Sequence, residues 1–190
     1  MASRDVVIVI GSPRENGNSA SLALQAAEGV RKAGGEPQVF RIADMDLRPC
    51  RACDTCQKKK NYSCVINDDM RLLYPVLRKA RGLLIASPVY WFSVSAQTKL
   101  FMDRLYAFVG PKGHGLKGKK MGVILVYGDI DPFTSGAVNA LRMFQDSFAY
   151  IGAPVEGMVY GSANSAGEVN ENKALLRDAA ALGRRLAGGE

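Results

Sequence analysis

Most of the common catalytic and membrane-binding devices are missing from this sequence. Its 190 residues include a single histidine, His114, and no apolar run reaches the about 18 residues that a membrane-spanning helix requires. Neither the G-x-x-x-x-G-K-[S/T] phosphate loop nor the G-x-G-x-x-G dinucleotide fingerprint is present. We therefore expect no membrane span, no Walker-type site and no Ser-His-Asp triad. We interpret His114, in a glycine- and lysine-rich stretch, as a surface-loop residue.

Cysteines are scarce and confined to one place. All four, Cys50, Cys53, Cys56 and Cys64, fall in a C-x2-C-x2-C-x7-C pattern. Thiolates are soft ligands for zinc and for iron–sulfur clusters. Three cysteines at equal x2 intervals are typical of the bacterial ferredoxin run, whereas structural zinc usually takes two knuckles separated by a longer stretch. The pattern favours a [4Fe–4S] cluster, with zinc and unligated or redox thiols as alternatives.

The net charge bears on which partners the protein binds, and the N-terminal sequence bears on its cellular compartment. The net charge is +7, and lysines concentrate at 58–60 and 112–120 without interleaved aromatic residues, so we expect no nucleic-acid binding. These lysines indicate solvated loops, or attraction of phosphorylated cofactors or of an acidic redox partner such as a ferredoxin. The start, MASRDVVIVIGSPRE, is not typical of a signal peptide, because its apolar run is short and leads into a glycine turn. We expect a cytoplasmic protein with reduced thiols.

Short apolar runs alternate with amphipathic stretches along the chain. Strands are predicted at 6–10, 37–42, 83–86, 121–127 and 155–160, and helices at 19–33, from 68 or 69 onward, 95–108, 136–151 and 168–187. The segment 47–67 is expected to be an irregular, cysteine-rich insert. The alternation implies a single domain over residues 1–190 with a parallel sheet covered on both faces. Ligands of such sheets bind beyond the carboxyl ends of the strands.

The segment 11–19, GSPRENGNS, joins the first predicted strand to the first helix. Backbone N–H groups and the dipole at a helix N-terminus hold phosphate well, and serine, asparagine and arginine side chains can add hydrogen bonds. The alternative is a polar turn that only caps the helix. We assign phosphate binding to Ser12, Arg14, Asn18, Ser19 and the adjacent Ala20.

A second unusual segment, SPVYWF at 87–92, follows the third predicted strand. Three consecutive aromatic residues cannot all face the core, and exposed aromatic surface usually covers a partner or a flat ligand. A flat isoalloxazine ring would fit, and a subunit interface is the alternative; both can hold. We expect the ring to lie along Pro88, Val89, Tyr90, Trp91 and Phe92. A third wall is expected at the end of the fourth strand, from Tyr127, Gly128 and Asp129.

The motifs G-S-P-R-x-x-G-N-S, A-S-P-V-Y-W-F-S at 86–93 and K-L-F-M-D-R at 99–104 together resemble the NAD(P)H-dependent FMN reductase family, over residues 5 to about 161. The resemblance implies a flavodoxin-like three-layer sandwich with a five-stranded parallel sheet in the order 2-1-3-4-5. It also implies NAD(P)H as electron donor and a homo-oligomer, dimer or tetramer, with flavin near the interface. The cysteine segment resembles that of the iron–sulfur flavoproteins, a branch of this family.

We therefore predict an FMN-dependent oxidoreductase or electron-transfer flavoprotein whose side chains bind the cofactor and need not act as acids or bases. A single phosphate loop, with no second phosphate or adenine site, favours FMN over FAD. With a [4Fe–4S] cluster, electrons would pass between cluster and FMN. Without one, NAD(P)H would reduce FMN for a quinone, azo compound, metal ion or free flavin. The alternatives are a pure electron carrier, which the positive charge disfavours, and a zinc-stapled, non-enzymatic binding module.

Overall fold

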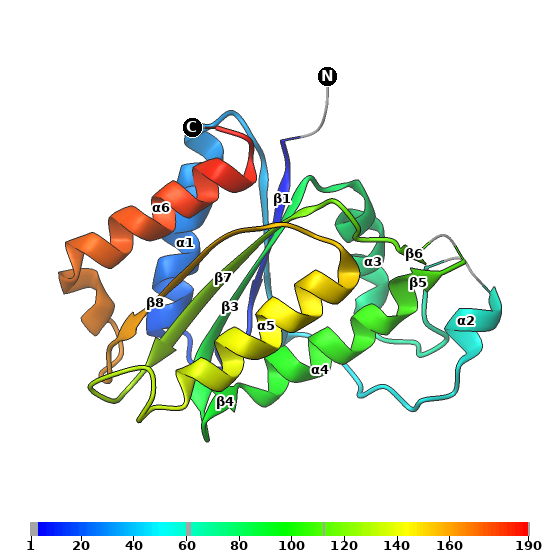
Figure 1. Cartoon of the computed structure of the whole chain (residues 1–190), viewed down its shortest axis with the longest axis horizontal. Helices are drawn as coiled ribbons and strands as arrows, with labels where there is room; N and C mark the ends of the chain where they lie inside the picture. The colour runs from blue at the N-terminus through cyan, green and yellow to red at the C-terminus, as the bar shows by residue number, and fades with distance from the viewer. Residues whose placement is uncertain (1–3, 60–61, 112, 190) are drawn as a thin grey trace.

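Five parallel strands form the centre of the computed structural model, which describes residues 4–59, 62–111 and 113–189 (Figure 1). They are β1 (Val6–Ile10), β2 (Pro37–Arg41), β3 (Gly82–Tyr90), β7 (Lys120–Tyr127) and β8 (Val155–Ser162). Their order is β2-β1-β3-β7-β8, and each neighbouring pair is parallel. The predicted flavodoxin-like sheet and its strand order are therefore confirmed.

Helices cover both faces of this sheet (Figure 1). One face packs against α1 (Asn18–Lys32) and α6 (Lys173–Leu186), and the other against α3 (Met70–Lys79), α4 (Ala96–Arg104) and α5 (Ala137–Ile151). Successive strand residues point to opposite faces, so Val6 and Ile8 join the first core while Val7 and Val9 join the second. Both faces are apolar, which explains why β1 is a continuous run of valine and isoleucine.

Several element boundaries differ from the sequence prediction. The strand predicted at 83–86 continues to Tyr90, because a two-residue turn pairs its end with the antiparallel strand β4 (Ser93–Val94). The helix predicted at 95–108 is α4 followed by a 3-10 helix, η2 (Leu105–Phe108), and the last predicted helix is η3 (Glu168–Glu171) followed by α6. The segment 42–67, predicted as irregular from 47, holds the short helices η1 (Ile42–Asp44) and α2 (Thr55–Lys59).

The prediction that His114 is a plain surface residue is wrong. His114 lies in β6 (Gly113–His114), which pairs with β5 (Val109–Gly110). Its ring is partly buried beside Phe108, its Nε2 lies 3.2 Å from the carbonyl oxygen of Leu105, and its Nδ1 accepts from the N–H of Leu116 at 3.2 Å. Burial lowers the pKa of His114. The ring therefore connects the β5–β6 hairpin to η2 at both Leu105 and Phe108, a role that no local pattern in the sequence indicates.

The two lysine-rich runs, 58–60 and 112–120, are predicted to be solvated loops or sites that attract an acidic partner. They lie partly outside the described residues, because they include residues 60 and 112. Within the part of the chain that is described, no helix has the length and apolar character needed to cross a membrane.

Candidate functional site

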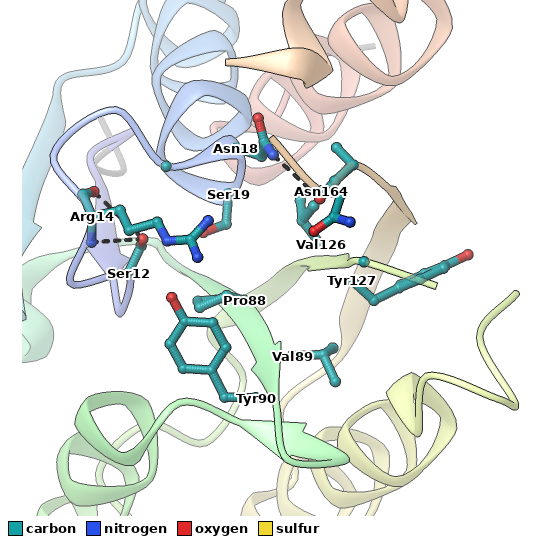
Figure 2. A pocket seen from close by; sticks show the side chains of 13 residues that line it. Ser12, Arg14, Asn18, Ser19, Pro88, Val89, Tyr90, Val126, Tyr127 and Asn164 are labelled. Atoms are coloured by element: carbon teal, nitrogen blue, oxygen red, sulfur yellow. Dashed lines mark hydrogen bonds between the residues drawn. The ribbon is translucent and has the colours of Figure 1, made fainter. Parts of the chain in front are cut away.

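A polar pocket of about 170 Å³ lies beyond the carboxyl ends of β1, β3 and β7 (Figure 2). It is therefore at the edge of the sheet where ligands of parallel α/β folds bind. Four segments form it: the β1–α1 loop and the carboxyl ends of β3, β7 and β8. Its lining residues are Ser12, Arg14, Gly17, Asn18, Ser19, Pro88, Val89, Tyr90, Val126, Tyr127, Gly128, Ala163 and Asn164.

The β1–α1 loop is a tight turn that ends in the first residues of α1. The Oγ of Ser12 accepts from the backbone N–H of Arg14 at 3.2 Å, and the N–H of Gly17 donates to the Arg14 carbonyl at 3.2 Å. α1 has no acidic residue in its first turn. The unpaired N–H groups and the positive end of the helix dipole therefore face a pocket without a competing carboxylate, which suits an anion.

Ser19 carries the clearest sign of a missing ligand. Its side-chain oxygen is buried and has no hydrogen-bond partner among the described residues, although it belongs to the pocket lining. A buried hydroxyl without a partner is destabilising, so such a group in a native protein usually binds a ligand or a water molecule. Figure 2 shows Ser12, Arg14 and Ser19 converging on the same part of the pocket, with the Arg14 guanidinium extended across it. These donors fit a phosphate group.

A second arginine supports the loop from outside the pocket. Arg41, at the end of β2, donates from Nη1 to the carbonyl of Glu15 at 3.1 Å and from Nη2 to that of Arg14 at 3.4 Å. Its Nε also donates to Asp44 at 2.9 Å. The Arg14 backbone is thereby held by Arg41 and Ser12, which leaves its exposed side chain available for a ligand.

Asn18 and Ala20 are placed differently from the sequence assignment. The Asn18 amide donates to the carbonyls of Ala163 at 3.3 Å and Ser165 at 2.8 Å, and its oxygen accepts from the N–H of Val169 at 3.2 Å. Its polar atoms are thus engaged with the loop after β8, although the residue borders the pocket. Ala20 is buried in the core beneath α1 and does not belong to the pocket lining. Asn18 therefore lines the pocket with its polar side-chain atoms already bonded, and Ala20 lies outside the lining.

The aromatic segment divides between the pocket and its mouth. Pro88, Val89 and Tyr90 line the polar pocket, while Trp91 and Phe92 form the turn between β3 and β4. These two line an adjoining hollow of about 310 Å³ with Val89, Tyr127, Gly128, Asp129, Thr134 and Ser135. The two spaces share Val89, Tyr127 and Gly128, so the residues of the predicted second and third walls meet along one continuous surface.

The turn at the mouth is strained. Trp91 and Phe92 have φ values of 49° and 63°, in the left-handed region that glycine and asparagine normally occupy in such two-residue hairpins. Trp91 is 92% exposed, so little packing offsets this conformation. Phe92 lies against Gly136, where an added Cβ would come within 2.5 Å of the Phe92 Cβ, and its carbonyl accepts from Asn139 at 3.1 Å. The turn therefore keeps two bulky residues in a left-handed backbone conformation at an energetic cost.

We expect Trp91→Gly to raise the melting temperature by about 1–3 °C. Relief of a left-handed conformation is worth about 1–2 kcal/mol, and the extra unfolded-state entropy of glycine removes about 0.5–1 kcal/mol of that gain. For a chain of this size 1 kcal/mol corresponds to about 2–4 °C. Calorimetry measures the shift, with Leu72→Ala, which removes another exposed apolar side chain, as control. A lower melting temperature for Trp91→Gly would contradict the strain.

Sequence reasoning missed the residues from the end of β8. Ala163 and Asn164 line the pocket, and an added Cβ on Gly128 would lie 3.3 Å from the Asn164 side-chain oxygen. The rule that ligands bind beyond strand ends would have indicated them, because they lie within four residues of the end of the fifth predicted strand, 155–160. Val126, one residue before the predicted third wall, was missed for lack of any polar or aromatic signal.

The four cysteines lie in the segment between η1 and α3, outside the lining of the pocket. Cys50 and Cys53 are exposed, Cys64 is partly buried and Cys56 is 8% exposed. Among the described residues, no group of three or more cysteine, histidine or acidic side chains is placed to share a metal ion. A hydrogen bond from the Thr55 hydroxyl, at 3.5 Å, lowers the pKa of the Cys53 thiol. The described arrangement fits reduced thiols and does not present a preformed set of cluster ligands.

A protein family and several known proteins are similar in sequence to this chain. Residues 4–167 match the model of the family described as NADPH-dependent FMN reductase. An iron-sulfur flavoprotein of Archaeoglobus fulgidus is 33% identical over 181 residues, which cover 94% of this chain and 77% of the relative. A second iron-sulfur flavoprotein of that organism is 38% identical over 124 residues, covering 65% of this chain and 62% of the relative. This second match leaves more than a third of the relative unaligned.

A solved structure shows the same fold over the whole chain. It is an NAD(P)H:quinone oxidoreductase from Methanothermobacter marburgensis, with a TM-score of 0.73 and 20% sequence identity, and the match covers 97% of this chain and 100% of that one. The family match includes all four segments that form the polar pocket. On this evidence the chain belongs to the NADPH-dependent FMN reductase family.

Proposed function

We propose that this chain is an oxidoreductase that binds FMN in the polar pocket and takes electrons from NAD(P)H. The observation that carries the proposal is the buried, unpartnered Ser19 hydroxyl at the N-terminus of α1, inside a pocket of a chain that belongs to an FMN reductase family. The donor set fits one phosphate. This supports FMN, with its single phosphate, over a dinucleotide.

Individual residues would hold different parts of the cofactor. Ser12, Arg14 and Ser19 would bind the phosphate, with Asn18 fixing the first turn of α1 against the loop at 163–169. Backbone and side chains of residues 88–92 and 127–129 would border the ring. Gly11 keeps the loop close to α4, because an added Cβ would lie 1.8 Å from the Thr98 hydroxyl oxygen. The chain's contribution is therefore binding, orientation and exclusion of water.

FMN, when bound, supplies the hydride and electron chemistry. The pocket contains no carboxylate or histidine placed as an acid or base, within its described lining. Burial raises the pKa of Tyr127, so its hydroxyl stays neutral at physiological pH and can only offer hydrogen bonds. For the acceptor we propose a flat organic molecule of the quinone type, supported by the hollow beside Trp91 and Phe92 and by the fold match to a quinone oxidoreductase.

The test is to identify the cofactor and follow its reduction. We expect protein refolded or purified with flavin to release FMN on denaturation, and to oxidise NADPH or NADH when benzoquinone is present. Released FAD would contradict the phosphate assignment. Bound FMN without oxidation of either nicotinamide would indicate an electron carrier, and a chain that binds no flavin would overturn the proposal.

A second proposal concerns the cysteines and rests on their spacing and on relatives named iron-sulfur flavoprotein. We expect protein prepared without oxygen to bind one [4Fe–4S] cluster, which requires the segment 50–64 to draw its thiols together. Replacement of any one of Cys50, Cys53, Cys56 or Cys64 by serine should then remove or destabilise the iron while FMN remains. Iron and acid-labile sulfide analysis measures this. Full FMN without iron or sulfide would leave reduced thiols, which suit a reducing compartment such as the cytoplasm.

We also propose that the protein is a homo-oligomer, a dimer or a tetramer. An apolar groove of about 430 Å³ runs between α4 and α5, with Met102, Leu105, Tyr106, Met143 and Tyr150 along it, and Tyr150 is 82% exposed. Exposed apolar side chains that gather in a groove often mark a protein–protein interface. A single 20.5 kDa species in light scattering would refute this.

An acidic redox partner, such as a ferredoxin, is proposed for the face of the cysteine segment that carries Arg51 and Lys58.

A further inference from the structure

A buried ion pair joins the two ends of the cysteine segment. The Asp68 and Arg104 side chains are 0% and 1% exposed. The Arg104 Nη2 donates to Asp68 Oδ1 at 3.1 Å, and its Nη1 donates to Asp68 Oδ2. Asp68 lies just after the last cysteine, while Arg104 is the last residue of α4. A two-point guanidinium–carboxylate contact fixes orientation as well as distance.

The same pair also holds the chain just before the first cysteine. Asp68 Oδ2 accepts from the N–H of Arg48 at 2.9 Å, and Arg104 Nη1 donates to the Arg48 carbonyl at 2.6 Å. Beside it, the N–H of Asp69 donates to the Asp46 carbonyl at 3.0 Å, and Asp69 Oδ2 accepts from the N–H of Asp46 at 2.9 Å. Residues 46–48 and 68–69 thus form a closed neck, and all four cysteines lie in the loop that this neck encloses.

The other end of α4 is fastened to the phosphate loop. Ser95, which caps α4, donates from its hydroxyl to the Gly11 carbonyl at 2.7 Å and accepts from the N–H of Thr98 at 3.2 Å. Its own N–H donates to the Ser87 hydroxyl at 3.0 Å. A helix of nine residues spans about 13–14 Å at 1.5 Å per residue. One short helix therefore has buried polar contacts to the flavin pocket at its start and to the cysteine neck at its end.

An ion pair this deeply buried is weak evidence for stability, because a well-packed apolar pair of similar volume often stabilises as much. What an apolar pair cannot supply is the set of directed bonds to Arg48. The contacts around Arg104 therefore indicate a role in orienting the chain at Arg48.

We propose that Arg104 and Asp68 are positioning residues that hold the cysteine segment at a fixed place relative to the flavin pocket through α4. The placement concerns this chain's own residues and needs no cofactor. Its use, the passage of electrons between the cysteine segment and the flavin, rests on the proposed function.

The experiment compares thiol reactivity in the unchanged protein and in Asp68→Leu/Arg104→Met, a pair chosen to keep the volume filled. Labelling by a thiol reagent is followed at each cysteine by mass spectrometry, with exposed Cys50 as the internal reference. We expect the label at buried Cys56 to appear about tenfold faster relative to Cys50, which corresponds to about 1.4 kcal/mol less protection. The control is Asp103→Asn, which removes an exposed ion pair with Lys99 on the same helix and should match the parent.

A folded double variant in which Cys56 stays as protected as in the parent would overturn the proposal. Should the double variant fail to fold, hydrogen exchange of the parent decides: slow exchange of the Arg48 and Met70 amides supports the closed neck, and fast exchange of both refutes it. FMN binding by the parent is titrated in a separate experiment. If the parent binds no FMN, the proposed function is contradicted, and the labelling result still decides whether the neck positions the cysteine segment.

Discussion

Replacement of Arg104 by methionine alone is expected to lower the free energy of unfolding by about 3–5 kcal/mol, because it leaves the Asp68 carboxylate buried without its charged partner. The double variant Asp68→Leu/Arg104→Met should recover most of this loss, since no charge then remains to be buried. Urea denaturation of the parent and both variants measures the three values. A single variant within about 1 kcal/mol of the parent would show that Asp68 finds water or another donor.

The same pair predicts an acid-dependent stability. Burial by itself raises the pKa of Asp68, but the hydrogen bonds from Arg104 and from the Arg48 N–H outweigh it and hold that pKa below its ordinary value. The folded state therefore binds this proton less readily than the unfolded state. The stabilisation is present above the unfolded pKa of about 4 and is lost as the pH falls through the lower folded pKa. The double variant, which lacks the carboxyl, should lose this component of the pH dependence, and so should Arg104→Met, which lacks the main group that lowers the Asp68 pKa.

Replacement of Arg14 by alanine is expected to weaken FMN binding by about 1.5–3 kcal/mol, or about tenfold to 150-fold in Kd, if its guanidinium bonds a phosphate. The loop itself should remain in place, because Ser12 and Arg41 hold the Arg14 backbone and not its side chain. Quenching of flavin fluorescence during titration measures the affinity. The difference between parent and variant should shrink as salt is added, since the interaction is between charges near solvent.

A matched control is Arg31→Ala, which removes an exposed arginine from the far end of α1, where it pairs with Glu28. It lowers the net charge by the same amount without touching the pocket. Equal weakening in Arg14→Ala and Arg31→Ala would assign the effect to overall charge. An unchanged Kd in Arg14→Ala would remove Arg14 from the phosphate site and leave Ser12, Ser19 and the start of α1 as its donors.

Much of the architecture is determined by local features of the sequence. Short continuous β-branched runs such as Val6–Ile10 predict strands that are buried on both faces. The amphipathic helices between these strands predict the layers that cover a parallel sheet. The glycine-, serine- and arginine-rich turn after β1 is likewise local, because its donors belong to one loop and one helix end. The placement of Ser12, Arg14 and Ser19 around one pocket could therefore be predicted from residue order alone.

Other features depend on segments that are far apart in the chain. Asn18 bonds residues near 163–169, and Arg104 bonds Asp68 and Arg48, so their roles follow only once the sheet has brought these segments together. His114 is partly buried because η2 packs beside its hairpin, and Trp91 faces solvent because a two-residue turn forces it outward. Periodicity reports which face of an element is apolar, whereas these directed polar contacts depend on how the elements pack. The sequence alone thus determined the sheet and the polar β1–α1 loop, and tertiary packing decided which polar side chains face the pocket and which hold distant segments together.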